Sequence, residues 1–343
     1  MSLKSIVKRG VFSAVPLRIR RYYRGEATIL MYHRLTDFKP REGEFCPNLP
    51  LAVSVDNFED QLKFLAENYN CLAMDDFYHS FLERRVPENA VLITFDDGYR
   101  DNLELMLPLL EKYRIPATIF LTISSVEQQR LMWWYEVEGR IKVANELQFF
   151  RQGIDYKFPL ASIHEKHLAY NKLNSMIKGS TPKERLEILK ILAEEMPEMA
   201  ASEAKPLTWE EVKKLSSSPL ITVGAHTETH QNLSLCSDAE LEKEISQAKT
   251  FLEDKIGKTL KYFSYPFGNR AHATQREFKA VEAAGFNLAC TTRLGHVHKE
   301  HLTALTALPR MPIGYGDSMH SFKWKLDGAY ATIFQKGRRV IVE

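Results

Sequence analysis

The 343-residue sequence has few of the features that mark a disulfide scaffold, a membrane-spanning protein or a nucleic-acid-binding protein. Its four cysteines have no paired spacing, which favours reduced thiols over a disulfide framework or a zinc cluster. No apolar run approaches the length of a membrane-spanning helix. The 46 Lys and Arg barely exceed the 44 Asp and Glu, so nucleic acid is not an expected partner. An apolar content of 44% is enough for a sizeable core, in two ordinary domains or in one α/β barrel with insertions.

Residues 1–26 are a basic N-terminal arm, in which Lys and Arg occur without an acidic partner until Glu26. A secretory signal is a poor fit, because the apolar stretch Gly10–Leu17 is short and no small-residue cleavage site follows it. We therefore expect a cytoplasmic protein. Two interpretations of the arm stay open: it associates peripherally with the anionic surface of the inner membrane, or it is a surface helix with solvated side chains. Pro16 interrupts any long amphipathic face and favours the second.

Residues 27–343 are predicted to form one α/β domain, because apolar, strand-like segments alternate with amphipathic helices. This alternation is typical of a parallel sheet that is covered by helices. The predicted strands are residues 27–32, 91–95, 116–121, 220–225, 261–265, 287–291 and 308–312. Capping boxes are predicted for helices that begin near Asp56, Thr208 and Ser237.

The alternation stops between about Gln128 and Lys205, where we predict a helical insertion (128–205) carried by a loop between a strand and a helix. Trp133, Trp134 and Tyr135 open this segment. They are candidates for stacking on a sugar, although packing of the insertion against the barrel is the commoner use of such residues. We expect the insertion to govern substrate choice.

Two carboxylates, Asp96 and Asp97, follow the strand 91–95 and precede Gly98. An Asp-Asp-Gly turn between a strand and a helix would account for them if they stood alone. However, neighbouring like charges at the end of a core strand are costly unless a cation or a proton divides them. At the end of another strand stand His226 and His230. Two imidazoles and a carboxylate are the ligand set of an open catalytic metal site.

In an α/β barrel the reactive residues lie on the loops at the C-terminal ends of the strands. His33 and the turn Pro266–Phe267–Gly268 occupy such positions, as do the two carboxylates and the two histidines. We expect all of them to meet on one rim of the barrel.

Three segments resemble the motifs of the polysaccharide deacetylase family, the NodB-homology carbohydrate esterases. Thr94–Gly98 is similar to the first motif, His226–His230 to the second, which reads His-Ser/Thr-x-x-His, and Tyr265–Gly268 to the third. The resemblance covers roughly residues 27–125 and 206–315. It implies a distorted (β/α)7 barrel, here with a helical insertion.

The resemblance also implies roles for single residues. One divalent metal, with Zn²⁺ as the first expectation, would be held by Asp97, His226 and His230. Asp96 would be the general base. The backbone N–H of Phe267 would bind the oxyanion, and Tyr265 in the same motif is a second substrate-binding candidate.

The chain departs from the family pattern at Ser264, where the common third motif carries an Arg. Arg310 could replace that Arg and orient Asp96, and a surface Arg in a loop is the alternative. The segment Met31–His33 resembles the subset of deacetylases that act on poly-N-acetylglucosamine and related exopolysaccharides, in which the catalytic His comes from the start of the domain. His33 is therefore the predicted general acid, and His320, into which no apolar strand leads, is the alternative.

The expected activity is metal-dependent removal of an N-acyl group, in the first place N-acetyl, from an amino sugar. The sugar would belong to a surface polysaccharide, such as an O-antigen or an exopolysaccharide, or to its nucleotide- or lipid-linked precursor. Two alternatives stay open. The same chemistry could act on another acyl group such as formyl, or the barrel could be inactive and bind carbohydrate. The intact carboxylates and histidines argue against the inactive barrel.

Overall fold

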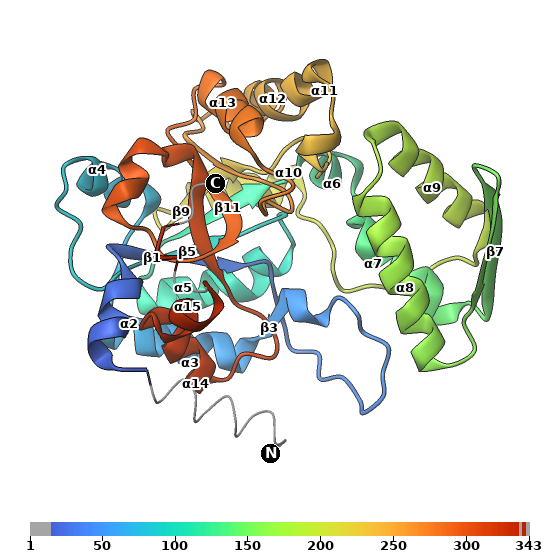
Figure 1. The fold of residues 1–343 in the computed structure, drawn as a ribbon, viewed down its shortest axis with the longest axis horizontal. Helices are drawn as coiled ribbons and strands as arrows, with labels where there is room; N and C mark the ends of the chain where they lie inside the picture. The colour runs from blue at the N-terminus through green and yellow to red at the C-terminus, as the bar shows by residue number, and fades with distance from the viewer. Residues whose placement is uncertain (1–14, 336–337, 341–343) are drawn as a thin grey trace.

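The structure is a computed structural model that describes residues 15–335 and 338–340. Within these residues, seven parallel strands close into a barrel, as predicted, and a separate group of helices stands beside it (Figure 1). The barrel closes because β1 pairs with both β5 and β12. The strands, in their order around the barrel, are β1 (Ala27–Tyr32), β5 (Ala90–Phe95), β6 (Ala117–Leu121), β9 (Ile221–Ala225), β10 (Tyr262–Ser264), β11 (Leu288–Leu294) and β12 (Leu308–Pro312).

Successive side chains of each barrel strand alternate between the interior and the surrounding helices. In β5, Leu92 packs in an interior cluster, whereas Val91 and Ile93 pack in the cluster that includes the outer helices. Because both faces are covered, β1, β5 and β6 are buried at every position. This explains why these strands appear in the sequence as unbroken apolar runs.

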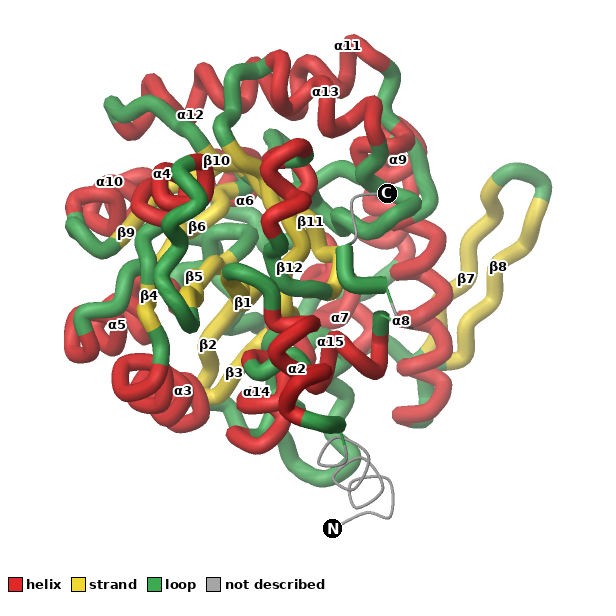
Figure 2. Tube along the Cα trace, turned by 60° about the vertical axis from the view of Figure 1, so that its left-hand side comes forward, coloured by secondary structure: helices red, strands yellow, loops and turns green. Residues whose placement is uncertain are grey.

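Helices cover the outside of the barrel and one of its ends (Figure 2). The helix α4 (Met74–Leu82) packs its apolar side chains against the interior cluster, next to the short strand β4 (Asn70–Cys71). The other covering helices are α2 (Leu17–Arg24), α3 (Val55–Asn68), α5 (Leu107–Tyr113), α6 (Ile123–Gln128), α10 (Trp209–Ser217), α11 (Asp238–Glu242), α12 (Ala248–Ile256), α13 (Gln275–Ala283), α14 (Met319–Leu326) and α15 (Ala329–Phe334). In the described part of the chain, no helix combines the length and the apolar character needed to cross a bilayer.

The helix ends follow the predicted capping chemistry with one exception. Thr208 and Ser237 form capping boxes at the starts of α10 and α11. The predicted box at Asp56 is wrong, because α3 begins one residue earlier, and Ser54 is its N-cap and accepts a hydrogen bond from the N–H of Asn57.

The segment between β6 and β9 contains the helices α7 (Trp133–Val143), α8 (Ile163–Lys178) and α9 (Pro182–Glu195). It also contains an antiparallel hairpin, β7 (Glu146–Arg151) and β8 (Ile154–Pro159), which was not predicted and which projects at one side of the molecule in Figure 2. Gln152 and Gly153 adopt the left-handed backbone conformations that a tight two-residue turn requires. Most of the buried apolar residues of this segment form a cluster of their own, in which Trp133, Trp134 and Tyr135 take part.

Of the predicted basic arm, residues 1–14 lie outside the described residues, and most of the rest forms α2. Arg20 binds Asp327, which follows α14, at 2.8 Å. Its neighbours Arg18 and Arg21 are exposed. The division of the chain into arm, barrel and insertion stays a prediction.

Candidate active site

The predicted site residues lie together at the C-terminal ends of the barrel strands. With the exception of Arg310, they line a pocket of about 310 Å³ whose other wall comes from the insertion and from the loop that precedes β3 (Ala52–Ser54). The barrel side of this pocket is formed by His33, Asp96, Asp97, His226, His230, Tyr265, Phe267 and Thr292.

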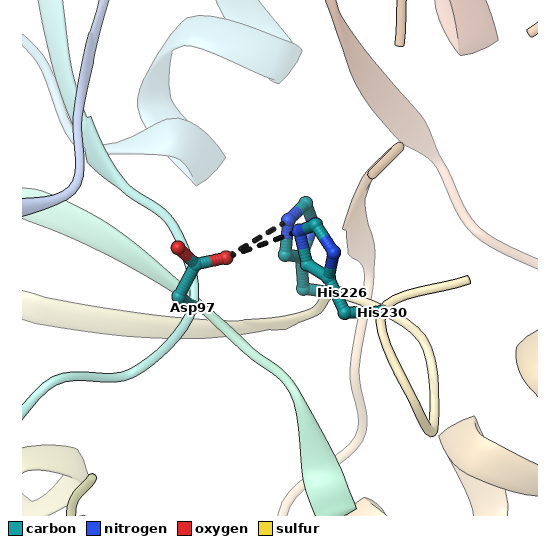
Figure 3. Close-up of side chains that lie close together, drawn as sticks. All are labelled: Asp97, His226 and His230. Carbon is teal, nitrogen blue, oxygen red and sulfur yellow. Dashed lines mark ion pairs between the residues drawn. The ribbon is translucent and has the colours of Figure 1, made fainter. Parts of the chain in front are cut away.

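Asp97, His226 and His230 form a compact, fully buried group (Figure 3). The Oδ1 atom of Asp97 lies 3.4 Å from Nε2 of His226 and 3.3 Å from Nε2 of His230. Neither carboxylate oxygen of Asp97 has a hydrogen-bond partner within the described residues. Buried, unpartnered carboxylate oxygens are rare because they cost free energy, and a cation bound between them and the two imidazoles would remove that cost. The three side chains therefore fit a divalent metal ion.

The backbone at two of these three residues has positive φ angles, and the resulting turns help to bring the three side chains together. Asp97 and Gly98 have φ angles of 78° and 83°, so the chain turns sharply after Asp96. The positive φ of Gly98 favours glycine at this position, and a Cβ atom there would also come within 2.7 Å of the end of the Leu121 side chain. His230 also has a positive φ, of 54°. Residues held in such conformations concentrate at functional sites.

Each histidine has its ring orientation fixed by neighbours. Nδ1 of His226 donates a hydrogen bond to the carbonyl oxygen of Ser264 at 2.7 Å, which leaves Nε2 facing Asp97. The ring of His230 contacts Trp134 from the insertion and Phe267 from the third motif, at centroid distances of 4.7 and 4.9 Å. Burial lowers the pKa of His230 to about 4, so this imidazole is neutral, the form that binds a metal.

Asp96 is held by Arg310 inside the barrel. Two guanidinium nitrogens bind the two carboxylate oxygens of Asp96 at 2.8 and 2.7 Å, and Arg310 has no exposed surface. Its remaining hydrogen bonds go to Thr94 Oγ1, Ser264 Oγ and the Thr291 carbonyl. The alternative of a surface arginine is therefore wrong. Burial alone would raise the pKa of Asp96, but the charges of Arg310 and of the histidines beside it outweigh burial and lower the pKa, so Asp96 is ionised at neutral pH.

The two candidate general acids lie in different places. His33 follows β1, is half-buried and lines the pocket together with Asp96 and Asp97. His320 lies on α14, is exposed and packs its ring against Trp324. Only the first is in reach of a substrate in this pocket.

Phe267 and Tyr265, the two substrate-binding candidates from the third motif, differ in what they offer to a ligand. Phe267 has a φ of 59°, and no described residue accepts a hydrogen bond from its backbone N–H, which leaves this donor available to a ligand. Tyr265 is buried, its hydroxyl donates to the carbonyl oxygen of Thr306 at 2.9 Å, and its N–H donates to the carbonyl oxygen of Cys290. The side chain of Tyr265 is thus used for packing, and it offers the pocket no polar group.

The insertion also brings residues to the site. Trp134, one of the three aromatic candidates for stacking on a sugar, lines the pocket, whereas Trp133 and Tyr135 do not. Tyr170, Asn171, Asn174 and Lys178 line it too and were not predicted from the sequence. Arg185 of α9 donates hydrogen bonds to the carbonyl oxygens of His230 and Thr229, at 2.8 and 2.9 Å. The insertion therefore holds the backbone of the loop that carries the second histidine.

Known proteins are similar to this chain in sequence and in fold. The family model for polysaccharide deacetylase matches residues 83–288. The YxkH protein of Bacillus subtilis strain 168, which is named after the polysaccharide deacetylases, is 24% identical over 304 residues, 88% of this chain and 75% of the relative. The poly-beta-1,6-N-acetyl-D-glucosamine N-deacetylase of Staphylococcus aureus strain MRSA252 is 29% identical over 126 residues, which are 33% of this chain and 42% of the relative.

A solved structure extends the likeness in fold to most of the chain. The deacetylase PplD of Streptococcus pyogenes, in complex with acetate, superposes with a TM-score of 0.59 at 19% identity, over 88% of this chain and 97% of that one. Since the family model matches more than half of the sequence and spans both β5, which Asp96 and Asp97 follow, and the loop that carries His226 and His230, the chain belongs to the polysaccharide deacetylase family.

Proposed function

We propose that this protein is a metal-dependent hydrolase that removes the N-acetyl group from an amino sugar of a surface polysaccharide or of its nucleotide- or lipid-linked precursor. The observation that carries the proposal is the buried group of Asp97, His226 and His230 beside an ionised Asp96 in one pocket. Zn²⁺ suits a site with one carboxylate and two imidazoles. When bound, a divalent cation would polarise the acyl carbonyl group and lower the pKa of a water molecule.

The chain's own residues would then carry the proton transfers. Asp96, which Arg310 keeps ionised and oriented, would take a proton from the attacking water. The N–H of Phe267 would donate a hydrogen bond to the acyl oxygen as negative charge develops on it. His33 would give a proton to the departing amine nitrogen. Without that proton the amide bond would not break, because an amide anion is a poor leaving group.

Release of acetate from a panel of N-acetylated amino sugars tests this proposal. The panel contains β-1,6-linked N-acetylglucosamine oligomers, N-acetylglucosamine and nucleotide-linked N-acetylglucosamine, with the N-formyl analogues as a second set. We expect acetate release that chelation abolishes and that added Zn²⁺ restores. Faster release of formate than of acetate would favour the formyl alternative. Carbohydrate binding by the metal-loaded protein without any acyl release would identify an inactive barrel and refute the proposal.

We also propose that α2 brings the protein to an anionic membrane surface on the cytoplasmic side. This helix exposes Leu17, Ile19 and Tyr22 together with Arg18 and Arg21. Apolar side chains interleaved with basic ones suit the interface of an anionic bilayer.

A further inference from the structure

The helix α8 presents a row of polar side chains to the active-site pocket. Asn171, Asn174 and Lys178 all line the pocket, and their spacing of three and four residues places them on one face of the helix. A neighbouring face of α8 packs into the insertion through Leu173 and Ile177. One wall of the pocket is therefore a polar surface that the family motifs do not include.

Lys178 stands out in this row because it is the charged member, beside two neutral amides. Its side chain is half-buried, and among the described residues no carboxylate forms an ion pair with it. The ammonium nitrogen lies 5.4 Å from the ring centroid of Phe267, the same ring that contacts the metal-site histidine His230. Burial lowers the pKa of Lys178, as expected for a cation that has lost water without gaining an anion.

The backbone of Lys178 is also held by residues 226–232, the loop that carries His226 and His230 and that we call the metal-site loop. Its carbonyl oxygen accepts a hydrogen bond from the side chain of Asn232 at 3.2 Å, and the nearby Ser180 carbonyl accepts one from Gln231. The end of α8 is therefore tied to the segment that follows His230, and this holds the backbone of Lys178 beside the pocket.

The other charged groups of the pocket do not balance Lys178. Asp96 is paired with Arg310, and Asp97 belongs to the group of metal ligands. His272, which does not line the pocket but whose ring contacts Phe267, has its pKa lowered by burial and by the charge of Lys178, so it stays neutral. A divalent cation at the ligand group would make this end of the pocket still more positive.

We infer that Lys178 forms a subsite for a negatively charged group of the substrate, and that the natural substrate is an N-acetylated amino sugar that carries a phosphate or a carboxylate close to the acyl group. This inference rests on the proposed function. Asn174, whose buried Oδ1 atom has no hydrogen-bond partner among the described residues, would accept a hydrogen bond from a sugar hydroxyl next to the anionic group. A phosphate would come from a nucleotide- or lipid-linked sugar, and a carboxylate would come from a uronic acid.

Binding constants for three probes test the subsite. The probes are N-acetylglucosamine, which is neutral, N-acetylglucosamine 1-phosphate, and the uronic acid of N-acetylglucosamine. Their dissociation constants are measured by calorimetry on the metal-loaded, full-length protein. We expect at least one anionic probe to bind more tightly than the neutral one. In Lys178→Gln this preference should fall by roughly ten- to hundredfold, the range expected for a charge-assisted hydrogen bond.

Lys172→Gln is the matched control, because Lys172 lies on the same helix, is exposed and does not line the pocket. It removes the same charge and should leave the preference as it is. Lys178→Glu should reverse the preference toward the neutral probe. An unchanged preference in Lys178→Gln, or an equal fall in Lys172→Gln, would overturn the subsite.

The wild type and the variants at Lys178 and Lys172 all carry the same metal site. A change in the charge preference among them therefore reports on Lys178 and not on direct contact between the anion and the metal. The comparison also separates the subsite from the proposed function. Acetate release from the neutral probe without any charge preference in binding would overturn the subsite and leave the deacetylase. A preference that depends on Lys178, without acetate release from any probe, would support the subsite and refute the deacetylase.

Discussion

Replacement of Arg310 by Met should destabilise the fold and change the pH dependence of catalysis at the same time. Arg310 makes two hydrogen bonds to Asp96 and further ones to Thr94, Ser264 and Thr291, all of them inside the barrel. Loss of one partner of a buried ion pair leaves an uncompensated charge and costs about 3–5 kcal/mol. We therefore expect the free energy of unfolding of Arg310→Met to fall by about this amount.

The influences that shift the pKa of Asp96 determine in which direction the pH dependence of catalysis should move. Burial raises this pKa, and the charge of Arg310 is the largest influence that lowers it. In Arg310→Met the pKa of Asp96 should therefore rise. Since Asp96 must be ionised to accept a proton, the acid limb of the kcat/KM profile should move to higher pH.

Linkage gives a matching prediction for stability. In the wild type the folded-state pKa of Asp96 lies below the unfolded value, so its contribution to stability is present above the unfolded pKa and is lost as the pH falls through the folded one. In Arg310→Met the sign reverses, because the folded-state pKa is raised. The destabilisation should therefore grow as the pH rises from acidic to neutral.

Urea denaturation at acidic and neutral pH and a pH–rate profile measure both effects. Arg34→Met is the control, because Arg34 forms another buried ion pair, with Asp101 at 2.8 Å. It should lose stability without moving the acid limb. The double variant Asp96→Asn with Arg310→Met should regain part of the stability but no activity, since both charges are gone. An unmoved acid limb in Arg310→Met would refute the assignment of Asp96 as the base.

Three further predictions concern the metal, the acid and the membrane. His226→Ala should lose the metal and the activity, whereas Asp96→Asn should keep the metal and lose hydrolysis; the opposite pattern in metal analysis would mean that the two roles are misassigned. His33→Ala should keep the metal and lower kcat by roughly a hundredfold to ten-thousandfold, as expected for a lost general acid, and should flatten the alkaline limb of the pH–rate profile; a near-wild-type rate would contradict this role. Neutralising Arg18 and Arg21 should weaken sedimentation with anionic vesicles, as should high salt, and salt-insensitive binding would favour the solvated helix.

The barrel could be predicted from the sequence because its strands are covered on both faces. Such strands appear as continuous apolar runs, and the polar residues that follow them mark one rim. The same logic explains Arg310. It lies two residues after Leu308 on β12 and therefore points into the interior, as Asp96 does after Thr94 on β5. The alternation of inward and outward side chains along one strand can be predicted from the sequence. The sequence does not show that β12 and β5 bring Arg310 to Asp96, so it could not exclude that Arg310 is a surface residue.

The insertion could be predicted only in outline. The hairpin β7–β8 has only a partial signal in the sequence, because polar and apolar residues alternate from Glu146 to Phe149 but not through Phe150 and Arg151, and a Gln-Gly pair follows β7. The contacts of the insertion with the site leave no such signal. Lys178 and Arg185 stand at ordinary positions of amphipathic helices, and only the packing of α8 and α9 against the barrel places them beside the pocket and the metal-site loop.

This packing alters what we expect from removal of the insertion. If the insertion only selected substrates, a chain without residues 130–205 would still cleave a small N-acetyl sugar. However, Arg185 holds the carbonyl oxygens of Thr229 and His230, and Trp134 packs on the His230 ring. Loss of these contacts should free the second histidine and weaken metal binding, so activity should fall on small and large substrates alike.

Arg185→Gln tests this reasoning without removal of the insertion, because it shortens the side chain and removes the two guanidinium nitrogens that bind the loop. We expect weaker binding of Zn²⁺ and a changed visible spectrum of the Co²⁺-substituted protein, since the geometry at His230 is no longer fixed. Arg151→Gln is the control, because Arg151 is a buried arginine of the insertion that pairs with Glu184 and Glu187 and makes no contact with the metal-site loop. Equal metal affinity in wild type and Arg185→Gln would show that the loop that carries His230 keeps its conformation without Arg185. The insertion would then be expected to affect substrate choice and not metal binding.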